Sequence, residues 1–94
     1  MIKRSRIEYA KQFQKQLKKA PIEIKTAFLK RRVLFSENPS DSSLNNHALT
    51  GKLLGKRSIN ITGDWRAIYS ESLTEEGETV VMFYLLGTHS QLYK

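Results

Sequence analysis

The sequence contains no cysteine and no hydrophobic run long enough to cross a membrane. Without cysteine the chain has no disulfide framework, no thiolate metal site and no thiol nucleophile. The longest apolar run, Val80 to Leu86, has the length of a strand, well short of the roughly 18 residues of a membrane span. The basic N-terminus is not followed by an apolar segment of the kind found in signal peptides. We therefore expect a cytoplasmic protein without a membrane association.

Acidic residues are also scarce, because 9 Asp and Glu are outnumbered by 16 Lys and Arg and the net charge is +7. Such an excess favours polyanionic partners, which are nucleic acids, anionic membranes or acidic proteins. The 94 residues leave room for one domain, which we place at residues 1–94. A hydrophobic content of 39% is enough for a modest core.

The hydrophobic period predicts a strand and two helices in the first half of the chain. Residues 4–9 alternate in the manner of a half-buried strand. Between residues 10 and 20 apolar side chains recur every three to four positions, which predicts an amphipathic helix, and Pro21 suits the first turn of a second helix. We expect Lys30, Arg31 and Arg32 near the C-terminal end of that helix, where cations complement the helix dipole. Its apolar stripe consists of Ile24, Ala27, Phe28, Leu34 and Phe35.

The second half of the chain is predicted to form a loop and then a sheet. Residues 36–46 are rich in Ser, Asn and Asp, and we expect a loop without a core residue. The alternation of Ile59 and Ile61, followed by a Thr-Gly turn, predicts a hairpin. Residues 79–86 are apolar on both faces, as in a central strand covered on both sides, and Gly87 is expected to end it. Residues 90–93 are expected to add a short edge strand.

The predicted fold class is therefore α+β. An N-terminal strand and a two-helix hairpin would pack on a small, mostly antiparallel, twisted sheet.

Several common catalytic motifs are missing from the sequence. His47 and His89 are 42 positions apart and there is no cysteine, so no metal site is expected. The segment from Gly51 to Lys56 contains two glycines but lacks the spacing of a phosphate-binding loop. The serines do not have the sequence context of a nucleophile elbow.

A cluster of polar, titratable and cationic residues in the C-terminal half still requires an explanation. Metal-free cleavage of RNA would use such a set, because a base removes the 2′-hydroxyl proton, a cation stabilises the phosphate and an acid protonates the leaving 5′-oxygen. Histidine can act at either end of this reaction. The candidate residues are His47, Lys52, Lys56, Arg57, Asp64, Arg66, His89 and Tyr93.

Each candidate also has a structural interpretation. His47 can be a surface loop residue, and His89 can secure the chain end by hydrogen bonding. Asp64 suits a turn, and Trp65 suits packing in the core or on the sheet. Arg66 is either a solvated residue or a phosphate ligand, and the net charge of +7 favours the interpretation as a phosphate ligand.

Three segments of the C-terminal half resemble one bacterial family. HALTG begins at His47, RSINITGDWRAIY begins at Arg57 and LGTHSQLY begins at Leu86. Together they resemble the YafQ branch of the RelE/ParE toxin superfamily, and the predicted order of strand, two helices and sheet extends the resemblance to the whole chain. The resemblance implies a RelE-like fold and a bacterial type II toxin that cleaves mRNA in the ribosomal A site and is silenced by an acidic antitoxin.

The resemblance also implies roles for individual residues. Two positions depart from the family pattern, since Asn60 occupies the place of a histidine in the best-known member and Leu85 occupies the place of an expected arginine. We hypothesise that Arg66 or Arg57 supplies the missing cation. The family motifs imply functional roles for His47, Asp64, Trp65, His89 and Tyr93.

The sequence thus predicts a ribosome-dependent mRNA endoribonuclease that needs neither metal nor cofactor, with an acidic antitoxin, the ribosome and mRNA as partners. His47 and His89 would share the base and acid roles in an order left open, and Asp64 would orient a histidine. Arg66 would bind phosphate and Tyr93 would position a base. Further contacts with RNA are expected from Lys52, Lys56, Arg57 and Trp65. The alternative is a ParE-like toxin that inhibits DNA gyrase, or a degenerate toxin that only binds its antitoxin. The missing arginine favours this alternative, whereas the paired histidines argue against it.

Overall fold

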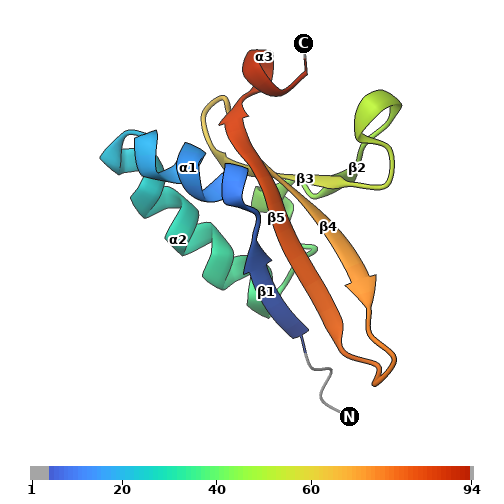
Figure 1. Cartoon of the computed structure of the whole chain (residues 1–94). Coiled ribbons are helices and arrows are strands. Elements are labelled where there is room, and N and C mark those ends of the chain that lie inside the picture. Colours follow the sequence, from blue (N-terminus) through green and yellow to red (C-terminus); the bar gives the residue numbers. More distant parts are fainter. Residues whose placement is uncertain (1–4, 94) are drawn as a thin grey trace.

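The structure, a computed structural model that describes residues 5–93, begins with the strand and the helix pair expected from the sequence (Figure 1). Strand β1 (Ser5–Tyr9) leads into helix α1 (Lys11–Lys19), and helix α2 (Ile22–Glu37) follows after Pro21 and lies beside α1. Arg4, the first residue of the predicted strand, lies outside the described residues. None of the helices in the described residues is long and apolar enough to cross a membrane.

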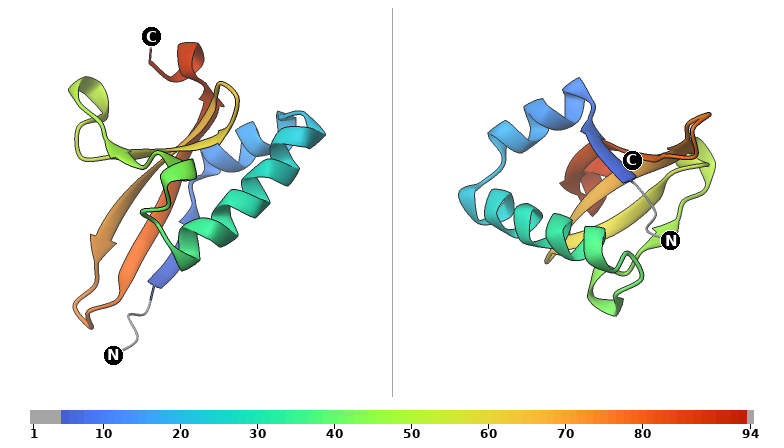
Figure 2. Two further views of the ribbon diagram at one scale, coloured as in Figure 1. Left: turned by 180° about the vertical axis from the view of Figure 1, so that it is seen from behind. Right: turned by 90° about the horizontal axis from the view of Figure 1, so that it is seen from below.

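The remainder of the chain builds a five-stranded sheet in the order β1-β5-β4-β3-β2. Strand β1 is parallel to β5, and all other neighbours are antiparallel. Both α1 and α2 cover the same face of the sheet (Figure 2). The predicted α+β fold class is therefore confirmed. The elements after α2 are the 3₁₀ turn η1 (Ser42–Leu44), strand β2 (His47–Ala48), the 3₁₀ turn η2 (Gly51–Leu53), strands β3 (Arg57–Thr62), β4 (Trp65–Leu73) and β5 (Thr79–Thr88), and the short helix α3 (His89–Leu92).

Aromatic rings from the helices and the sheet form the centre of the core. Phe13 of α1, Phe28 of α2 and Phe83 of β5 are at most 1% exposed, and their ring centroids lie 5.1–5.5 Å apart. Ile59 and Ala67 add fully buried side chains from β3 and β4. Apolar residues three to four positions apart on the helices meet residues two positions apart on the strands, so both sets form one layer. This layer fixes the strand ends that carry the candidate residues.

Two expectations about the region around residue 37 are wrong. Helix α2 continues to Glu37, so the basic residues 30–32 lie in its middle and not in its last turn. The helix continues because its apolar stripe does, and Phe35 packs against Tyr69 with ring centroids 4.9 Å apart. The loop after α2 also contributes to the core, since Leu44 of η1 is fully buried.

Three expectations about the end of the sheet are wrong as well. The helices cover only one face of β5, and Tyr84, next to the fully buried Phe83, is 42% exposed. Gly87 does not end the strand, which runs to Thr88, and residues 90–93 do not form an edge strand because His89–Leu92 is helical. A capping box begins this helix, since the Thr88 hydroxyl accepts the backbone N–H of Gln91 and the Gln91 side chain accepts the backbone N–H of Thr88.

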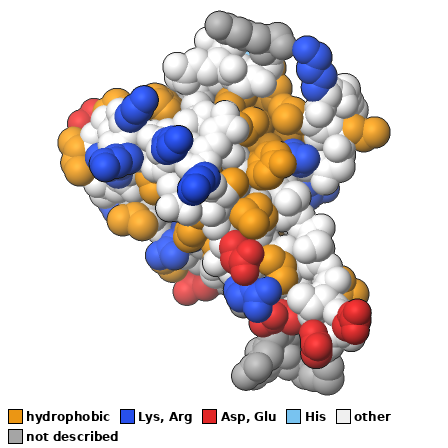
Figure 3. Space-filling view, viewed as in Figure 1, with side chains coloured by type: hydrophobic (Ala, Val, Ile, Leu, Met, Phe, Trp, Pro, Cys, Tyr) orange, Lys and Arg blue, Asp and Glu red, His pale blue; other side chains and the backbone are white. Residues whose placement is uncertain are grey.

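The surface is unevenly charged. In the view of Figure 3, Lys and Arg side chains gather over the helices, hydrophobic side chains occupy the centre, and Asp and Glu side chains lie toward the end of the molecule that holds the β4–β5 turn. The positive potential of the protein is therefore not spread evenly over its surface.

Candidate active site

A hollow lies between the segment around strand β2 and the C-terminal helix α3. Its volume is about 440 Å³, which falls within the range of about 300–1,000 Å³ typical of small-ligand sites. The sheet brings its parts together, because β2 pairs with β3, β3 with β4 and β4 with β5, which continues into α3. We refer to this site as the histidine hollow, and its lining includes Asn45, His47, Thr50, Arg66, His89 and Tyr93.

His47 enters the hollow from the beginning of β2, with an exposed side chain. Its Nδ1 lies 2.7 Å from the backbone oxygen of Asn45. Since a carbonyl oxygen can only accept a hydrogen bond, Nδ1 donates, and Nε2 then holds the lone pair of the neutral ring. Asn45 has a left-handed backbone with φ of 45°, a conformation that asparagine adopts more readily than most residues. This turn leaves Nε2 as the nitrogen that can remove a proton.

Asn46 anchors the segment that carries His47. Its side-chain nitrogen donates to the Tyr69 hydroxyl at 2.8 Å and to the backbone oxygen of Pro39 at 3.1 Å, and its side-chain oxygen accepts from Arg57 Nε at 2.8 Å. Tyr69 is 2% exposed, and burial raises its pKa above the ordinary value by more than the hydrogen bond from Asn46 lowers it. Its hydroxyl therefore stays neutral, and the network ties the loop to strands β3 and β4.

Sequence analysis missed the function of Asn46. The signal that could have found it is the pair of asparagines that directly precedes His47, because asparagine side chains stabilise turns by hydrogen bonding to nearby groups.

His89 and Tyr93 lie on successive turns at the other side of the hollow. Their ring centroids are 4.6 Å apart, and the Tyr93 backbone N–H donates to the His89 oxygen at 3.0 Å. The His89 backbone N–H donates to the backbone oxygen of Asp64 at 3.0 Å, which ties α3 to the β3–β4 turn. The buried Tyr93 hydroxyl has no hydrogen-bond partner within residues 5–93. A bound ligand with a polar group would satisfy this hydroxyl.

Arg66 contributes the cation of the hollow. Its Nη1 lies 3.4 Å from the backbone oxygen of Gly63, which is a long hydrogen bond, and the ion pairs of the described residues do not include Arg66. Its guanidinium is therefore available to an anion such as a phosphate.

Leu85, which occupies the place of the expected arginine, lies on the same face of the sheet as Arg66. Leu85 is directly opposite Ile68, and Ile68 is two residues from Arg66 on β4. Directly opposite residues share a face, and so do residues two apart, with diagonal neighbours about 7–8 Å from each other. The Arg66 guanidinium can thus reach the region that an arginine at position 85 would occupy.

Other predicted site residues do not line the hollow. Asp64 has an exposed side chain in the turn before β4, and its backbone oxygen accepts the N–H of His89 at the start of α3. Trp65 packs against the core and lines a separate pocket with Gln16 and Leu86. Lys56 Nζ lies 4.6 Å from the centroid of the Tyr84 ring.

The two remaining basic candidates also lie outside the lining. Arg57 donates through Nε to Asn46, as described above, and does not line the hollow. Lys52 is exposed on η2, two residues after the lining residue Thr50. Groups of three or more His, Cys, Asp or Glu side chains that could bind a metal do not occur in residues 5–93.

The chain is similar to solved structures of small bacterial toxins. The crystal structure of YafQ from E. coli strain BL21(DE3) is 26% identical, covers 97% of this chain and 100% of that chain, and gives a TM-score of 0.77. A toxin from Helicobacter pylori is also 26% identical, with coverage of 94% and 98% and a TM-score of 0.62. A YoeB/ParE toxin from Agrobacterium tumefaciens shares the fold at 14% identity, with coverage of 89% and 98% and a TM-score of 0.71. A search of curated protein sequences finds no match.

The order of strand, helix pair and sheet, together with these matches, defines a toxin of the RelE superfamily. Over residues 5–94 the sequence also matches the family described as "Bacterial toxin of type II toxin-antitoxin system, YafQ". The chain therefore belongs to the YafQ family of toxins, and the resemblance inferred from its motifs is confirmed.

Proposed function

We propose that this YafQ-family toxin is an endoribonuclease that cleaves mRNA on the ribosome. The observation that carries the proposal is the histidine hollow, in which two imidazoles, one guanidinium and one phenol share a single concavity. A pure binding surface has no chemical need for two histidines beside a cation, whereas cleavage by general acid–base catalysis would use that set.

The reaction begins with His47 as the base. Its Nε2 removes the proton of a 2′-hydroxyl, and the 2′-oxygen attacks the neighbouring phosphorus. As the bond from phosphorus to the 5′-oxygen breaks, protonated His89 donates a proton to that oxygen. The products are a 2′,3′-cyclic phosphate and a 5′-hydroxyl, and the step consumes no water. We take His47 as the base because the Asn45 carbonyl accepts its Nδ1 hydrogen and leaves Nε2 to face the substrate.

Arg66 and Tyr93 stabilise and position the reacting phosphate. The Arg66 guanidinium donates to the non-bridging oxygens, where negative charge increases in the transition state. The Tyr93 hydroxyl, which is buried without a partner in residues 5–93, donates to the phosphate or to a base. Asp64 positions His89 through its backbone oxygen and not through its carboxylate. Lys52 contacts the RNA backbone next to the hollow.

The proposed partners are an acidic antitoxin, the ribosome and mRNA in the bacterial cytoplasm. YafQ of E. coli has been solved in complex with DinJ, with 25% identity to this chain and a TM-score of 0.65. RelBE2 from Mycobacterium tuberculosis is likewise a toxin–antitoxin complex. The net charge of +7 suits both an acidic protein and ribosomal RNA.

The proposal can be tested by adding the purified chain to a translation reaction and mapping transcript ends by primer extension. Codon-phased cuts that depend on ribosomes are the expected result. In parallel, a supercoiling assay with DNA gyrase tests the alternative function, inhibition of gyrase, which the leucine at position 85 favours. The His47→Ala, His89→Ala double variant should lose cleavage while retaining the circular dichroism spectrum of the parent. Cleavage by the double variant at the parent rate would exclude the mechanism, and inhibition of gyrase without mRNA cuts would favour the alternative.

A further inference from the structure

Strand β5 is irregular close to the histidine hollow. Consecutive residues of β4, Ile68 and Tyr69, pair with Leu85 and Phe83, so Tyr84 is an extra residue without a partner on β4. Such a β-bulge re-aims a side chain, and bulges are frequent next to active sites. Phe83 is fully buried under the helices, whereas Tyr84 is 42% exposed. Because neighbouring strand residues alternate, the Tyr84 ring lies on the face of the sheet that the helices leave uncovered, which we refer to as the open face.

The open face also carries Arg66 of the hollow. Arg66 pairs with Gly87, three residues further along β5 than Tyr84, and a rise of about 3.3 Å per residue separates the two positions by about 10 Å. Strand β5 contains no acidic residue, and Glu71, the acidic residue of β4, pairs with Val81 of the core. The two strands therefore present no carboxylate on the open face that would repel the phosphates of a nucleic acid strand between Arg66 and Tyr84.

A cation lies over the Tyr84 ring. Lys56 Nζ is 4.6 Å from the ring centroid, and the ion pairs of the described residues do not include Lys56. A cation–π contact with an exposed ring is weak, and the ammonium is carried on a flexible stem. Lys56 can therefore turn from the ring to a phosphate while a base takes its place. Single-stranded nucleic acids bind such pairs, because the ring stacks on a base and the cation attracts the backbone.

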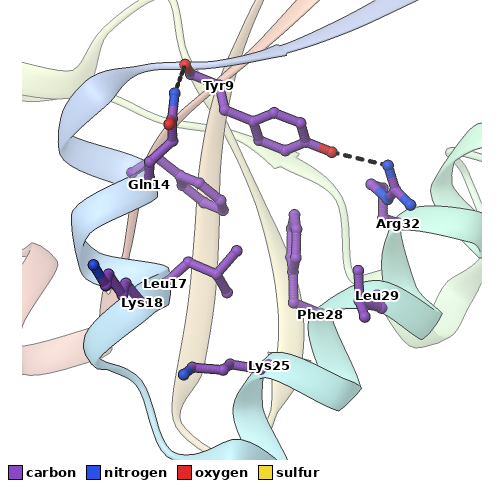
Figure 4. A pocket seen from close by; sticks show the side chains of 9 residues that line it. Tyr9, Gln14, Leu17, Lys18, Lys25, Phe28, Leu29 and Arg32 are labelled. Atoms are coloured by element: carbon purple, nitrogen blue, oxygen red, sulfur yellow. Dashed lines mark hydrogen bonds between the residues drawn. The ribbon is translucent and has the colours of Figure 1, made fainter.

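The cations of the helices lie on the other side of the sheet. A groove of about 550 Å³ opens between α1 and α2, and Lys18, Lys25 and Arg32 are among the residues that line it (Figure 4). The helices cover the face that carries Ala67, which is opposite to the face of Arg66. The sheet thus separates this groove from a strand bound in the histidine hollow, and further contacts with that strand come from the open face.

We propose that Tyr84 and Lys56 form a subsite for one base of the RNA strand whose phosphate lies in the histidine hollow. The base stacks on Tyr84, and Lys56 binds the phosphate of the same nucleotide. The inference rests on the proposed nuclease function for the identity of the strand. It adds to that function a residue that influences where an mRNA is cut, because preferences at a stacking site follow the stacking strength of the base. Purines, which have the larger ring surface, should be favoured there.

Fluorescence anisotropy with the full chain and labelled probes tests the subsite. The first probe is a short single-stranded oligoadenylate with 2′-O-methyl groups, which block the attacking oxygen and prevent cleavage. The second has the same backbone without bases, and the third is an oligoglutamate of equal charge. We expect the first probe to bind about tenfold more tightly than the second, because only the first can stack.

Variants locate the contact. Tyr84→Ala should remove the tenfold advantage of the first probe and leave binding of the second within about twofold of the parent, whereas Tyr84→Trp should retain the advantage. Lys56→Ala should weaken binding of both probes by about threefold, because it removes a contact with the backbone. Leu73→Ala serves as the matched control, because Leu73 is also exposed, at 70%, but lies at the far end of β4. Circular dichroism spectra equal to that of the parent exclude misfolding of the variants.

The translation reaction supplies a second readout. Stacking on a flanking base is equally strong before and during the reaction, so Tyr84→Ala should raise KM by about tenfold and leave kcat within about twofold of the parent. The cuts mapped by primer extension should also lose their preference for a flanking purine. A change confined to kcat would contradict a role in binding the flanking base.

The possible outcomes are distinct. Equal binding of the first two probes, or equal effects of Tyr84→Ala and Leu73→Ala on the first, would overturn the inference. Tighter binding of the oligoglutamate than of the first probe, lost in Tyr84→Ala, would assign the open face to an acidic protein instead. Because the probes cannot be cleaved, mRNA cleavage with probe binding independent of Tyr84 would overturn only the subsite. Binding that depends on Tyr84 without mRNA cleavage would overturn only the nuclease proposal.

Discussion

Replacing Arg66 by alanine tests the residue to which the catalytic proposal assigns the role of the missing arginine. The half-buried Arg66 side chain donates one long hydrogen bond within the described residues, 3.4 Å from Nη1 to the backbone oxygen of Gly63. Its removal should therefore change the free energy of unfolding by less than about 0.5 kcal/mol. Loss of a preorganised donor to the developing charge lowers kcat by about 10²–10³-fold, which corresponds to about 2.7–4 kcal/mol of transition-state stabilisation. Arg66→Ala should thus abolish most activity in a folded protein.

A second substitution makes the reasoning specific to the geometry. Leu85 lies on the same face as Arg66, one diagonal position away on the neighbouring strand. Adding Leu85→Arg to the Arg66→Ala variant should return the guanidinium to the hollow and recover at least about tenfold of the lost kcat. Arg66→Lys should recover less, because an ammonium does not contact phosphate through two parallel hydrogen bonds.

The assay is single-turnover cleavage of a defined mRNA in a purified translation reaction, with urea unfolding of each variant in parallel. Lys11→Ala removes a cation from an exposed position on α1 and serves as the charge-matched control. Cleavage by Arg66→Ala within about threefold of the parent, which is well below the effect of losing such a donor, would refute the role of this guanidinium. A kcat of the Arg66→Ala, Leu85→Arg double variant no higher than that of Arg66→Ala alone would contradict the shared geometry of the two positions.

Three further predictions concern the residues that position the hollow. Asn46→Ala removes three hydrogen bonds. It should lower the free energy of unfolding by about 2–3 kcal/mol, measured by urea unfolding, and kcat by about 10²-fold, measured in the cleavage assay. An unchanged kcat would contradict the anchoring of His47 by Asn46. Gly87→Ala places a Cβ 2.9 Å from Gln91 Oε1 and 3.3 Å from Leu92 Cδ2, and should cost about 1 kcal/mol by loosening the cap of α3. The cost should be smaller in a Gln91→Ala background, where only the contact with Leu92 remains. Burial raises the pKa of Tyr69 in the folded protein above the ordinary value of 10.0. The neutral hydroxyl therefore contributes stability that is fully present below pH 10.0 and is lost as the pH rises through the pKa of the folded state. The loss of unfolding free energy at alkaline pH should be smaller in Tyr69→Phe, and identical pH profiles of the unfolding free energy in the two proteins would contradict the shift.

Much of the architecture was predictable because it depends on local periodicity. The alternation before residue 10, the helical spacing of Phe13 and Phe28 and the two-residue period of Ile59 and Ile61 each identify an element and its buried face. The errors arose where local signals compete. Gly87 normally weakens a strand, yet here it allows close approach of Gln91.

The sequence by itself determined which chemical groups are available: two histidines, no thiol, a surplus of cations and the motifs of the YafQ family. Only the tertiary structure decided how those groups are distributed. Strand pairing and α3 bring His47, Arg66 and His89 around one hollow, while Arg57 is bound to Asn46. The physical reason is that residue spacing along a chain specifies faces of helices and strands, whereas distances between separate segments depend on sheet register and core packing. The same packing leaves the groove between α1 and α2 open, a feature that emerges only when both helices are placed on the sheet.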